Sequence, residues 1–290
     1  MGLTEDNSKN MRFGAHMSIA GSLVNAFERA EELGCETMQI FSRNPRSWAF
    51  KDIDPETATE FRRLSVASTA RPVVIHMPYL PNLAAGNEEK HQVSTRQLTT
   101  ELQRADTLEC PFIVTHTGKA LGLPLEDAIW QVVNAINRAI RESGTQTPML
   151  LLENTAGQGT EVGNTIDELA TIITKSDFPD RIGICLDTCH AHAAGYNLAS
   201  EDGFELLLDE IDEKLGLERL KVMHLNDSKG VCGSRLDRHN HIGQGHIGLE
   251  GFRRILNAPR VQDISGILET PENDDGNALS NLKTLRSLTA

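Results

Sequence analysis

The chain has 290 residues, of which 39% are hydrophobic and 24% are charged, a composition ordinary for a globular protein with a sizeable core. The net charge of −13 argues against a broad basic surface for nucleic acid. Three bound divalent cations would change that charge to −7, however, so charge alone does not decide the partner. No stretch approaches the roughly 18 apolar residues of a membrane span, and we expect no membrane association.

The N-terminal stretch MGLTEDNSKN (1–10) is short and polar, unlike a signal peptide, and we expect it to be a disordered tail. Residues 11–290 are expected to form a single domain. The five cysteines are an odd number and include no CxxC pair, which favours reduced thiols and a cytoplasmic location.

Eight short apolar runs recur along the chain, and each is expected to be a buried strand. They are MRFGAH (11–16), TMQIFS (37–42), PVVIHM (72–77), PFIVTH (111–116), MLLLEN (149–154), IGICLD (182–187), KVMHLN (221–226) and GILETP (266–271). Stretches of helical character lie between them, for example at 23–34, 126–144 and 165–176. A glycine ends the first two of these, as a helix C-cap would.

Near-continuous apolar strands that alternate with helices predict a parallel sheet covered on both faces. Eight such units in about 250 residues match a (β/α)8 TIM barrel, which would form one α/β domain. A doubly wound open sheet is the alternative, but nothing in that fold limits the number of strands to eight.

An ionisable residue stands at the end of each of the last six expected strands. In chain order these residues are His76, His116, Glu153, Asp187, His224 and Glu269. Any one of them alone would more often be a satisfied core or turn residue. In a TIM barrel the C-terminal strand ends meet at one mouth, where six such groups are buried together only at a high desolvation cost. Divalent cations remove that cost, because imidazoles and carboxylates are ligands that zinc takes.

Two loops add further candidate ligands. DTCHAHAAGY (187–196) contains His190, and DRHNHIGQGHIG (237–248) contains Asp237 and His239. The second stretch has three glycines and fits neither a helical nor a strand repeat, which predicts a loop. Asp237 and His239, with a third residue, could close a tetrahedral zinc site that keeps an open position.

These motifs resemble those of the endonuclease IV family, zinc-dependent TIM-barrel enzymes that cleave DNA at apurinic/apyrimidinic sites. The matching pieces are GAHMSIAG (14–21), FSRNPRSW (41–48), HMPYLPNL (76–83), LLENTAGQG (151–159), LDTCHAHAAGY (186–196), HLNDSKG (224–230), DRHNHIGQGHIG (237–248) and LETP (268–271), and they cover essentially the whole chain after residue 11. Thr117 stands where the family usually has proline, and His192 stands where it usually has phenylalanine. Neither departure removes a candidate ligand.

The resemblance implies a centre of three Zn²⁺ ions, and its nitrogen and oxygen ligands would also accept Mn²⁺ at one site. The implied ligands are His76, His116 and Glu153 for the first metal; Glu153 as a bridge with Asp187, His224 and Glu269 for the second; and His190, Asp237 and His239 for the third. The implied reaction hydrolyses the phosphodiester 5′ to an abasic site and leaves a 3′-hydroxyl and a 5′-deoxyribose phosphate. Glu153 and Glu269 are the expected catalytic residues, which would orient the attacking water or take its proton.

The resemblance also implies that loops after the second and third strands enter the DNA, here through Arg46, Tyr79 and Leu80. An aromatic and an aliphatic side chain can fill a base stack, while an arginine contacts phosphate or groove acceptors. The expected partner is double-stranded DNA with abasic sites, bound at the nucleoid by a monomer. His241 and His246 are expected to be bystanders near DNA phosphate.

Two other function classes remain open on the sequence. Sugar isomerases and epimerases share a barrel with a histidine and carboxylate metal site, but they use one or two metals and lack a counterpart of the 237–248 loop. A protein that binds damaged DNA or stores metal without catalysis is the non-enzymatic alternative. Retention of all nine candidate ligands favours the enzyme.

Overall fold

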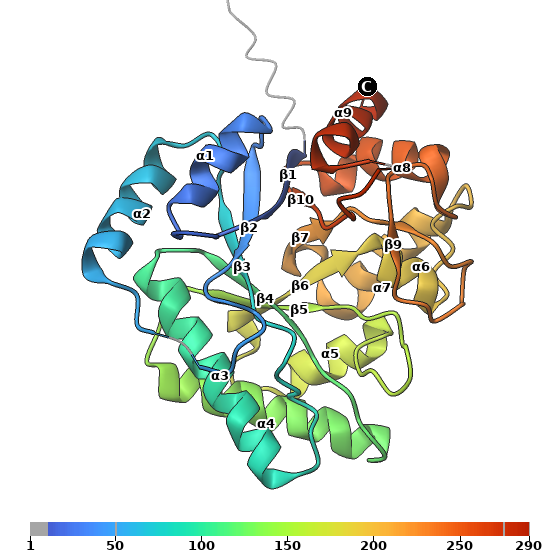
Figure 1. Ribbon diagram of the computed structural model, residues 1–290. Coiled ribbons are helices and arrows are strands. Elements are labelled where there is room, and N and C mark those ends of the chain that lie inside the picture. The colour runs from blue at the N-terminus through green and yellow to red at the C-terminus, as the bar shows by residue number, and fades with distance from the viewer. Residues whose placement is uncertain (1–10, 50, 275, 290) are drawn as a thin grey trace, which may run out of the picture.

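In the computed structural model, which describes residues 11–49, 51–274 and 276–289, eight parallel strands close into a barrel (Figure 1). The strands are β1 (Arg12–Met17), β2 (Thr37–Phe41), β3 (Val73–His76), β4 (Phe112–His116), β5 (Met149–Glu153), β6 (Ile182–Asp187), β7 (Leu220–His224) and β10 (Ser265–Leu268). The last strand pairs with the first in parallel, which closes the barrel and excludes the open sheet. The TIM-barrel prediction is confirmed, while the tail expected at 1–10 lies outside the described residues.

Helices surround the strands as an outer ring (Figure 1). They are α1 (Asn25–Glu32), α2 (Pro55–Ala67), α3 (Glu88–Thr107), α4 (Leu125–Ser143), α5 (Ile166–Lys175), α6 (Thr188–Ala194), α7 (Gly203–Leu215), α8 (Gly248–Asn257) and α9 (Ala278–Leu288), with 3-10 turns at Pro179–Arg181, Leu217–Arg219 and Pro259–Val261. Gly144 ends α4 with φ 69°, the left-handed C-cap expected from the sequence. None of the described helices has the length and apolar character that a bilayer crossing requires.

A small apolar layer fills the barrel below its mouth. It consists of Val74, Val114, Leu151, Cys185, Val222 and Ile267, all fully buried. Each of them stands two residues before the ionisable residue that ends its own strand. Because side chains alternate along a strand, both residues of each pair face the barrel interior. The ionisable residues therefore lie on a closed apolar floor.

The stretch 237–248 is only partly a free loop. Its residues His239–Asn240 form the short strand β9, which pairs antiparallel with β8 (Asp227–Ser228) just after β7. This two-stranded ribbon brings the chain that contains Asp237 and His239 back to the mouth of the barrel (Figure 1).

Candidate metal centre

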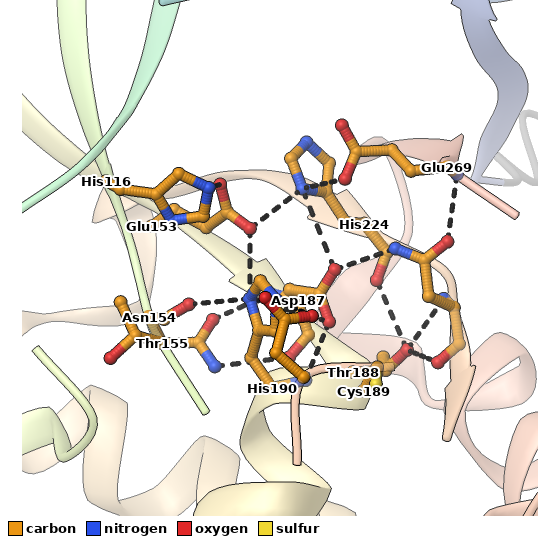
Figure 2. A network of polar contacts seen from close by, with 12 residues as sticks. His116, Glu153, Asn154, Thr155, Asp187, Thr188, Cys189, His190, His224 and Glu269 are labelled. Carbon is orange, nitrogen blue, oxygen red and sulfur yellow. Dashed lines mark hydrogen bonds and ion pairs between the residues drawn. The ribbon is translucent and has the colours of Figure 1, made fainter. Parts of the chain in front are cut away.

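The six strand-end residues meet at the barrel mouth around the carboxylate of Glu153. Figure 2 labels all of them except His76. Its oxygens lie 3.1 Å from His76 Nε2, 3.5 Å from His116 Nε2 and 3.3 Å from His224 Nδ1. On the other side, Glu269 Oε2 lies 3.2 Å from His224 Nδ1. Glu153 is completely buried, so its charge is compensated only by groups of this cluster.

The loop candidates join the same cluster. His190 Nε2 lies 3.3 Å from Asp237 Oδ1, and His239 Nε2 lies 3.8 Å from the same oxygen. His239 Nε2 is also 3.6 Å from Asp187 Oδ2 on β6. The chain thus brings together all nine residues that the sequence proposed as ligands.

The donor atoms form three compact sets among the described residues. They are His76, His116 and Glu153; Glu153, Asp187, His224 and Glu269; and Asp187, His190 and His239, with the atoms of each set within 4.8 Å of one another. The first two sets coincide with those implied by the family resemblance. The third contains Asp187 where the resemblance implies Asp237, although both carboxylates reach the same histidines.

Three of these histidines have one ring nitrogen fixed by a backbone carbonyl. Nδ1 of His76 lies 2.7 Å from Met77 O, Nδ1 of His190 lies 3.0 Å from Asn154 O, and Nδ1 of His239 lies 3.1 Å from Glu269 O. A carbonyl only accepts, so each Nδ1 carries a hydrogen and Nε2 is the ring nitrogen left for a cation. His239 Nε2 is buried with no hydrogen-bond partner among the described residues. Nitrogen lone pairs and carboxylate oxygens arranged in this way fit divalent cations.

The electrostatics of the cluster favour added positive charge. Burial opposes ionisation of the imidazoles, but it is outweighed by the carboxylates around His190 and by Cys185, Glu269 and Glu153 around His224. The pKa of both rings therefore lies well above the ordinary value. Burial likewise opposes ionisation of the acids, yet the histidines hold the pKa of Glu153 and Glu269 well below the usual range. A hydrogen bond from His190 lowers the pKa of Asp237 to about 2. These three carboxylates therefore stay ionised at neutral pH, as a cation site requires.

Two asparagines hold Asp187, one through its carboxylate and one through its backbone, and sequence reasoning missed both. Asn226 Nδ2 donates to Asp187 Oδ2 at 2.7 Å, and its Oδ1 accepts from the backbone N–H of Glu269 at 2.8 Å. Asn154 Oδ1 accepts from the backbone N–H of Asp187 at 2.7 Å (Figure 2). A signal was present, because each asparagine lies one or two residues after a candidate ligand, within the ENT and HLND motifs.

Asp227 organises the glycine-rich stretch and was also missed. Its fully buried carboxylate accepts backbone N–H bonds from Ser228, Gly243, Gly245, Ile247 and Gly248. A Cβ at Gly245 would lie 2.4 Å from Ser228 O and 2.5 Å from Asp227 Oδ1, so only glycine permits this approach. The glycines therefore let the chain wrap one carboxylate next to the metal candidates.

One histidine prediction needs correction. His241 is 2% exposed and hydrogen-bonds Asn273 and Asn281, so it packs the loop onto α9 and does not face DNA phosphate. His246 is exposed, as a solvent-facing bystander would be. Of the two departures from the family pattern, Thr117 is buried and donates to Val162 O, and His192 is buried with its pKa lowered by burial.

The expected DNA contacts surround the cluster without joining it. Arg46 and Tyr79 are exposed, and Leu80 is half-buried. Tyr79 and Leu80 line a cavity whose wall also contains His116 and Asp237, while Arg46 lines a second cavity beside His16. Both sets of side chains thus border the mouth.

A buried ion pair holds the loop that carries Arg46. Arg43 Nε lies 2.5 Å from Glu101 Oε1 on α3, and Arg43 Nη1 donates to Ser47 O at 2.7 Å. Arg104 on the same helix donates to Ser42 Oγ and to Lys51 O. The loop is therefore a fixed platform, which presents Arg46 at little ordering cost.

Comparisons with known proteins agree with this architecture. Residues 27–288 match the family model described as a xylose isomerase-like TIM barrel. A protein named "Probable endonuclease 4" from Methanoculleus marisnigri is 49% identical over 95% of this chain and 98% of its own length, and one from Chloroflexus aurantiacus is 45% identical over 96% and 98%. The crystal structure of endonuclease IV from Thermus thermophilus superposes with a TM-score of 0.86 at 41% identity, covering 96% of this chain and 98% of that one. A D-tagatose 3-epimerase-like protein, at 20% identity and a TM-score of 0.71, shares the fold over 96% of this chain and 97% of that one.

A closed parallel barrel with histidines and carboxylates gathered at its C-terminal mouth defines a xylose isomerase-like TIM barrel. Within that class, identity above 40% along nearly the whole length shows that the chain belongs to the endonuclease IV family, as its motifs indicated.

Proposed function

We propose that this protein is a DNA-repair endonuclease that hydrolyses the phosphodiester 5′ to an abasic site and leaves a 3′-hydroxyl and a 5′-deoxyribose phosphate. The observation that carries the proposal is the convergence of nine nitrogen and oxygen ligand candidates in a chain of this family. The nine residues would hold three Zn²⁺ ions, with Mn²⁺ acceptable at one site. His190, Asp237 and His239 would hold the third metal, and the carboxylate of Asp187 lies beside the same histidines.

The protein supplies orientation and proton transfer around the metals. Bound zinc would lower the pKa of water towards about 7 and neutralise charge on the phosphate. We assign Glu153 and Glu269 as catalytic residues that orient the attacking water and accept its proton. Glu153 is sealed from solvent, whereas the side chain of Glu269 is 19% exposed and borders the open mouth.

Recognition of an abasic site follows from what the mouth presents. An abasic nucleotide has no base to stack, so it leaves the duplex at lower cost than a paired nucleotide. Tyr79 and Leu80 would fill the gap in the stack, and Arg46 would contact phosphate. Double-stranded DNA is the proposed substrate, bound by a monomer in the cytoplasm.

A duplex with one tetrahydrofuran abasic analogue tests the proposal directly. The metal-replete protein should nick it once, on the 5′ side of the lesion, and should leave an undamaged duplex intact. Binding without nicking would instead indicate a damage-binding protein. Turnover of a ketose or aldose in place of DNA would indicate an isomerase or epimerase.

Replacing His239 with alanine tests the third metal. The variant should hold about two zinc ions per chain where the parent holds about three, because its Nε2 is the ring nitrogen aimed at Asp187 and Asp237. The nicking rate should fall by at least the 10–100-fold typical of a perturbed metal site. Mass spectrometry of untreated protein measures the zinc content. His246→Ala on the same loop is the matched control, and an unchanged zinc content in the His239 variant would remove this residue from the ligand set.

Replacing Arg46 with alanine tests the DNA interface. Loss of one phosphate contact should weaken binding to all duplexes alike and reduce the slope of log K against log salt by about 1. Binding titrations with catalytically inactive, metal-free protein at several salt concentrations provide the measurement. Arg138→Ala, which removes an exposed arginine from the outer face of α4, should leave the slope unchanged. Equal slopes for the parent and the Arg46 variant would contradict a phosphate contact.

A further inference from the structure

Gln39 is a fully buried polar residue in the middle of β2, and it is not one of the nine candidate ligands. Met38 and Ile40, on either side of it, pack outwards into the core between strands and helices. Strand alternation therefore turns Gln39 into the barrel, two residues above the inward-facing Thr37. A primary amide in the interior must find partners for its hydrogens and its oxygen.

All of its partners belong to the mouth of the barrel. Gln39 Nε2 donates to Glu269 Oε1 at 2.6 Å and lies 3.0 Å from His16 Nδ1. Gln39 Oε1 lies 2.9 Å from His224 Nε2. One side chain on β2 thus connects candidate ligands on β7 and at the end of β10.

The carboxylate of Glu269 determines which way the amide points. A carboxylate that binds a cation is ionised, so as a metal ligand Glu269 would only accept hydrogen bonds. The NH2 group of Gln39 must therefore face Glu269, which leaves the amide oxygen to face His224. His224 Nε2 then donates to the amide oxygen, and Nδ1 is the ring nitrogen left for a cation, between Glu153 Oε1 at 3.3 Å and Glu269 Oε2 at 3.2 Å.

His224 differs in this respect from the other anchored histidines. His76, His190 and His239 are each fixed through Nδ1 by a backbone carbonyl. His224 is fixed through the opposite nitrogen, and by a side chain. Its ring therefore presents Nδ1 to the cluster, and this orientation depends on a residue that a mutation can remove.

We propose that Gln39 is a positioning residue for the second metal of the centre, the one that Glu153, Asp187, His224 and Glu269 would hold. Its amide holds His224 in the tautomer that offers Nδ1, and it holds Glu269 so that Oε1 is occupied and Oε2 is left for the cation. The inference rests on the proposed metal centre. Outer partners of metal ligands contribute 10–100-fold to metal affinity, and we expect an effect of this size at one site of the three.

Gln39→Met and Thr37→Val provide the matched test. Methionine keeps the length of the side chain and removes both hydrogen-bonding groups. Thr37→Val removes a buried hydroxyl from the same face of the same strand, where it bonds Pro72 O and Ser265 Oγ away from the ligands. Zinc content is measured after equilibration against a graded series of chelator concentrations, with thermal unfolding of the metal-free proteins alongside.

We expect Gln39→Met to lose one zinc ion at a chelator concentration about 10–100-fold lower than the parent requires. Thr37→Val should lose stability but release zinc as the parent does. Substitution with Co²⁺ adds a spectroscopic measurement. Relative to the parent, the visible absorption of one of the three ions should change in Gln39→Met and stay unchanged in Thr37→Val. Gln39→Glu keeps an acceptor for His224 but sets a second carboxylate against Glu269, and it should also lose one ion.

If both Gln39 variants release zinc at the same chelator concentration as the parent and Thr37→Val, the positioning role is wrong. Should Gln39→Met not fold, the result for Gln39→Glu decides. Parent protein that holds no zinc would instead contradict the proposed metal centre itself, so the two failures are distinguishable.

Discussion

Glu153→Gln should slow nicking by orders of magnitude and release two of the three metals. Among the described residues, one ligand set contains His76 and another contains His224. The Glu153 carboxylate is the only group that belongs to both of these sets. Glutamine keeps the size of the side chain but removes its charge and one of its two acceptor oxygens. We expect the nicking rate to fall by a factor on the order of 10³ or more, which is the effect of removing a principal electrostatic group from an active site. Zinc content should fall from about three to about one.

Single-turnover nicking of the tetrahydrofuran duplex and mass spectrometry of the untreated variant measure the two effects. Glu168→Gln is the matched control, because Glu168 is also buried but bonds the backbone of Gly163 and lies outside the ligand sets. The control should keep its zinc and its rate. A Glu153 variant with three zinc ions and ordinary activity would show that the shared carboxylate does not bridge metals.

The fold could be predicted from the sequence because its signals are local and repeat. Each apolar run is long enough for one strand, and each intervening stretch has its own end signals, such as Gly144 after α4. The position of the ionisable residues followed from the fold, since every strand of a TIM barrel ends at the same mouth. His76 and His224 are far apart in the sequence, yet their rings lie 5.8 Å apart.

Contacts that depend on side-chain packing were not accessible in this way. Gln39 falls within an apolar run and was treated as part of a buried strand. Only the closed barrel shows that its inward neighbours are His16, His224 and Glu269. His91 on α3 is another such case, because its ring is buried and lies within hydrogen-bond distance of Gln131 O on α4.

The loop residues show a related limit. Spacing alone did not assign Asp237 and His239 to a site, and the family resemblance supplied that assignment. Their placement depends on Asp227, which follows a strand and has no pattern that marks it as a loop anchor. A carboxylate that accepts five backbone N–H bonds is visible only when the glycine-rich stretch is seen wrapped around it.

Asp227→Asn should destabilise the whole protein and remove the third metal. An amide presents NH2 where the native carboxylate accepts from Gly243, Gly245 and Gly248, so some of these backbone groups lose their partner in a fully buried site. We expect a free energy of unfolding lower by about 3 kcal/mol, the size typical for lost bonds to a charged acceptor. For a chain of this length that corresponds to a melting temperature lower by roughly 5–10 °C.

The functional consequence follows from the route of the chain. The bonds to Asp227 fix the stretch that begins with Asp237 and His239, and Ile242 and Ile247 of that stretch pack into the core. Loosening it should lower zinc content to about two per chain even at temperatures where the variant is folded. Asp180→Asn, at a side chain 98% exposed, should change stability by no more than about 0.5 kcal/mol and leave zinc unchanged. Full zinc occupancy in a folded but destabilised Asp227 variant would separate the loop anchor from the metal site, because the third metal would then depend on its ligands alone.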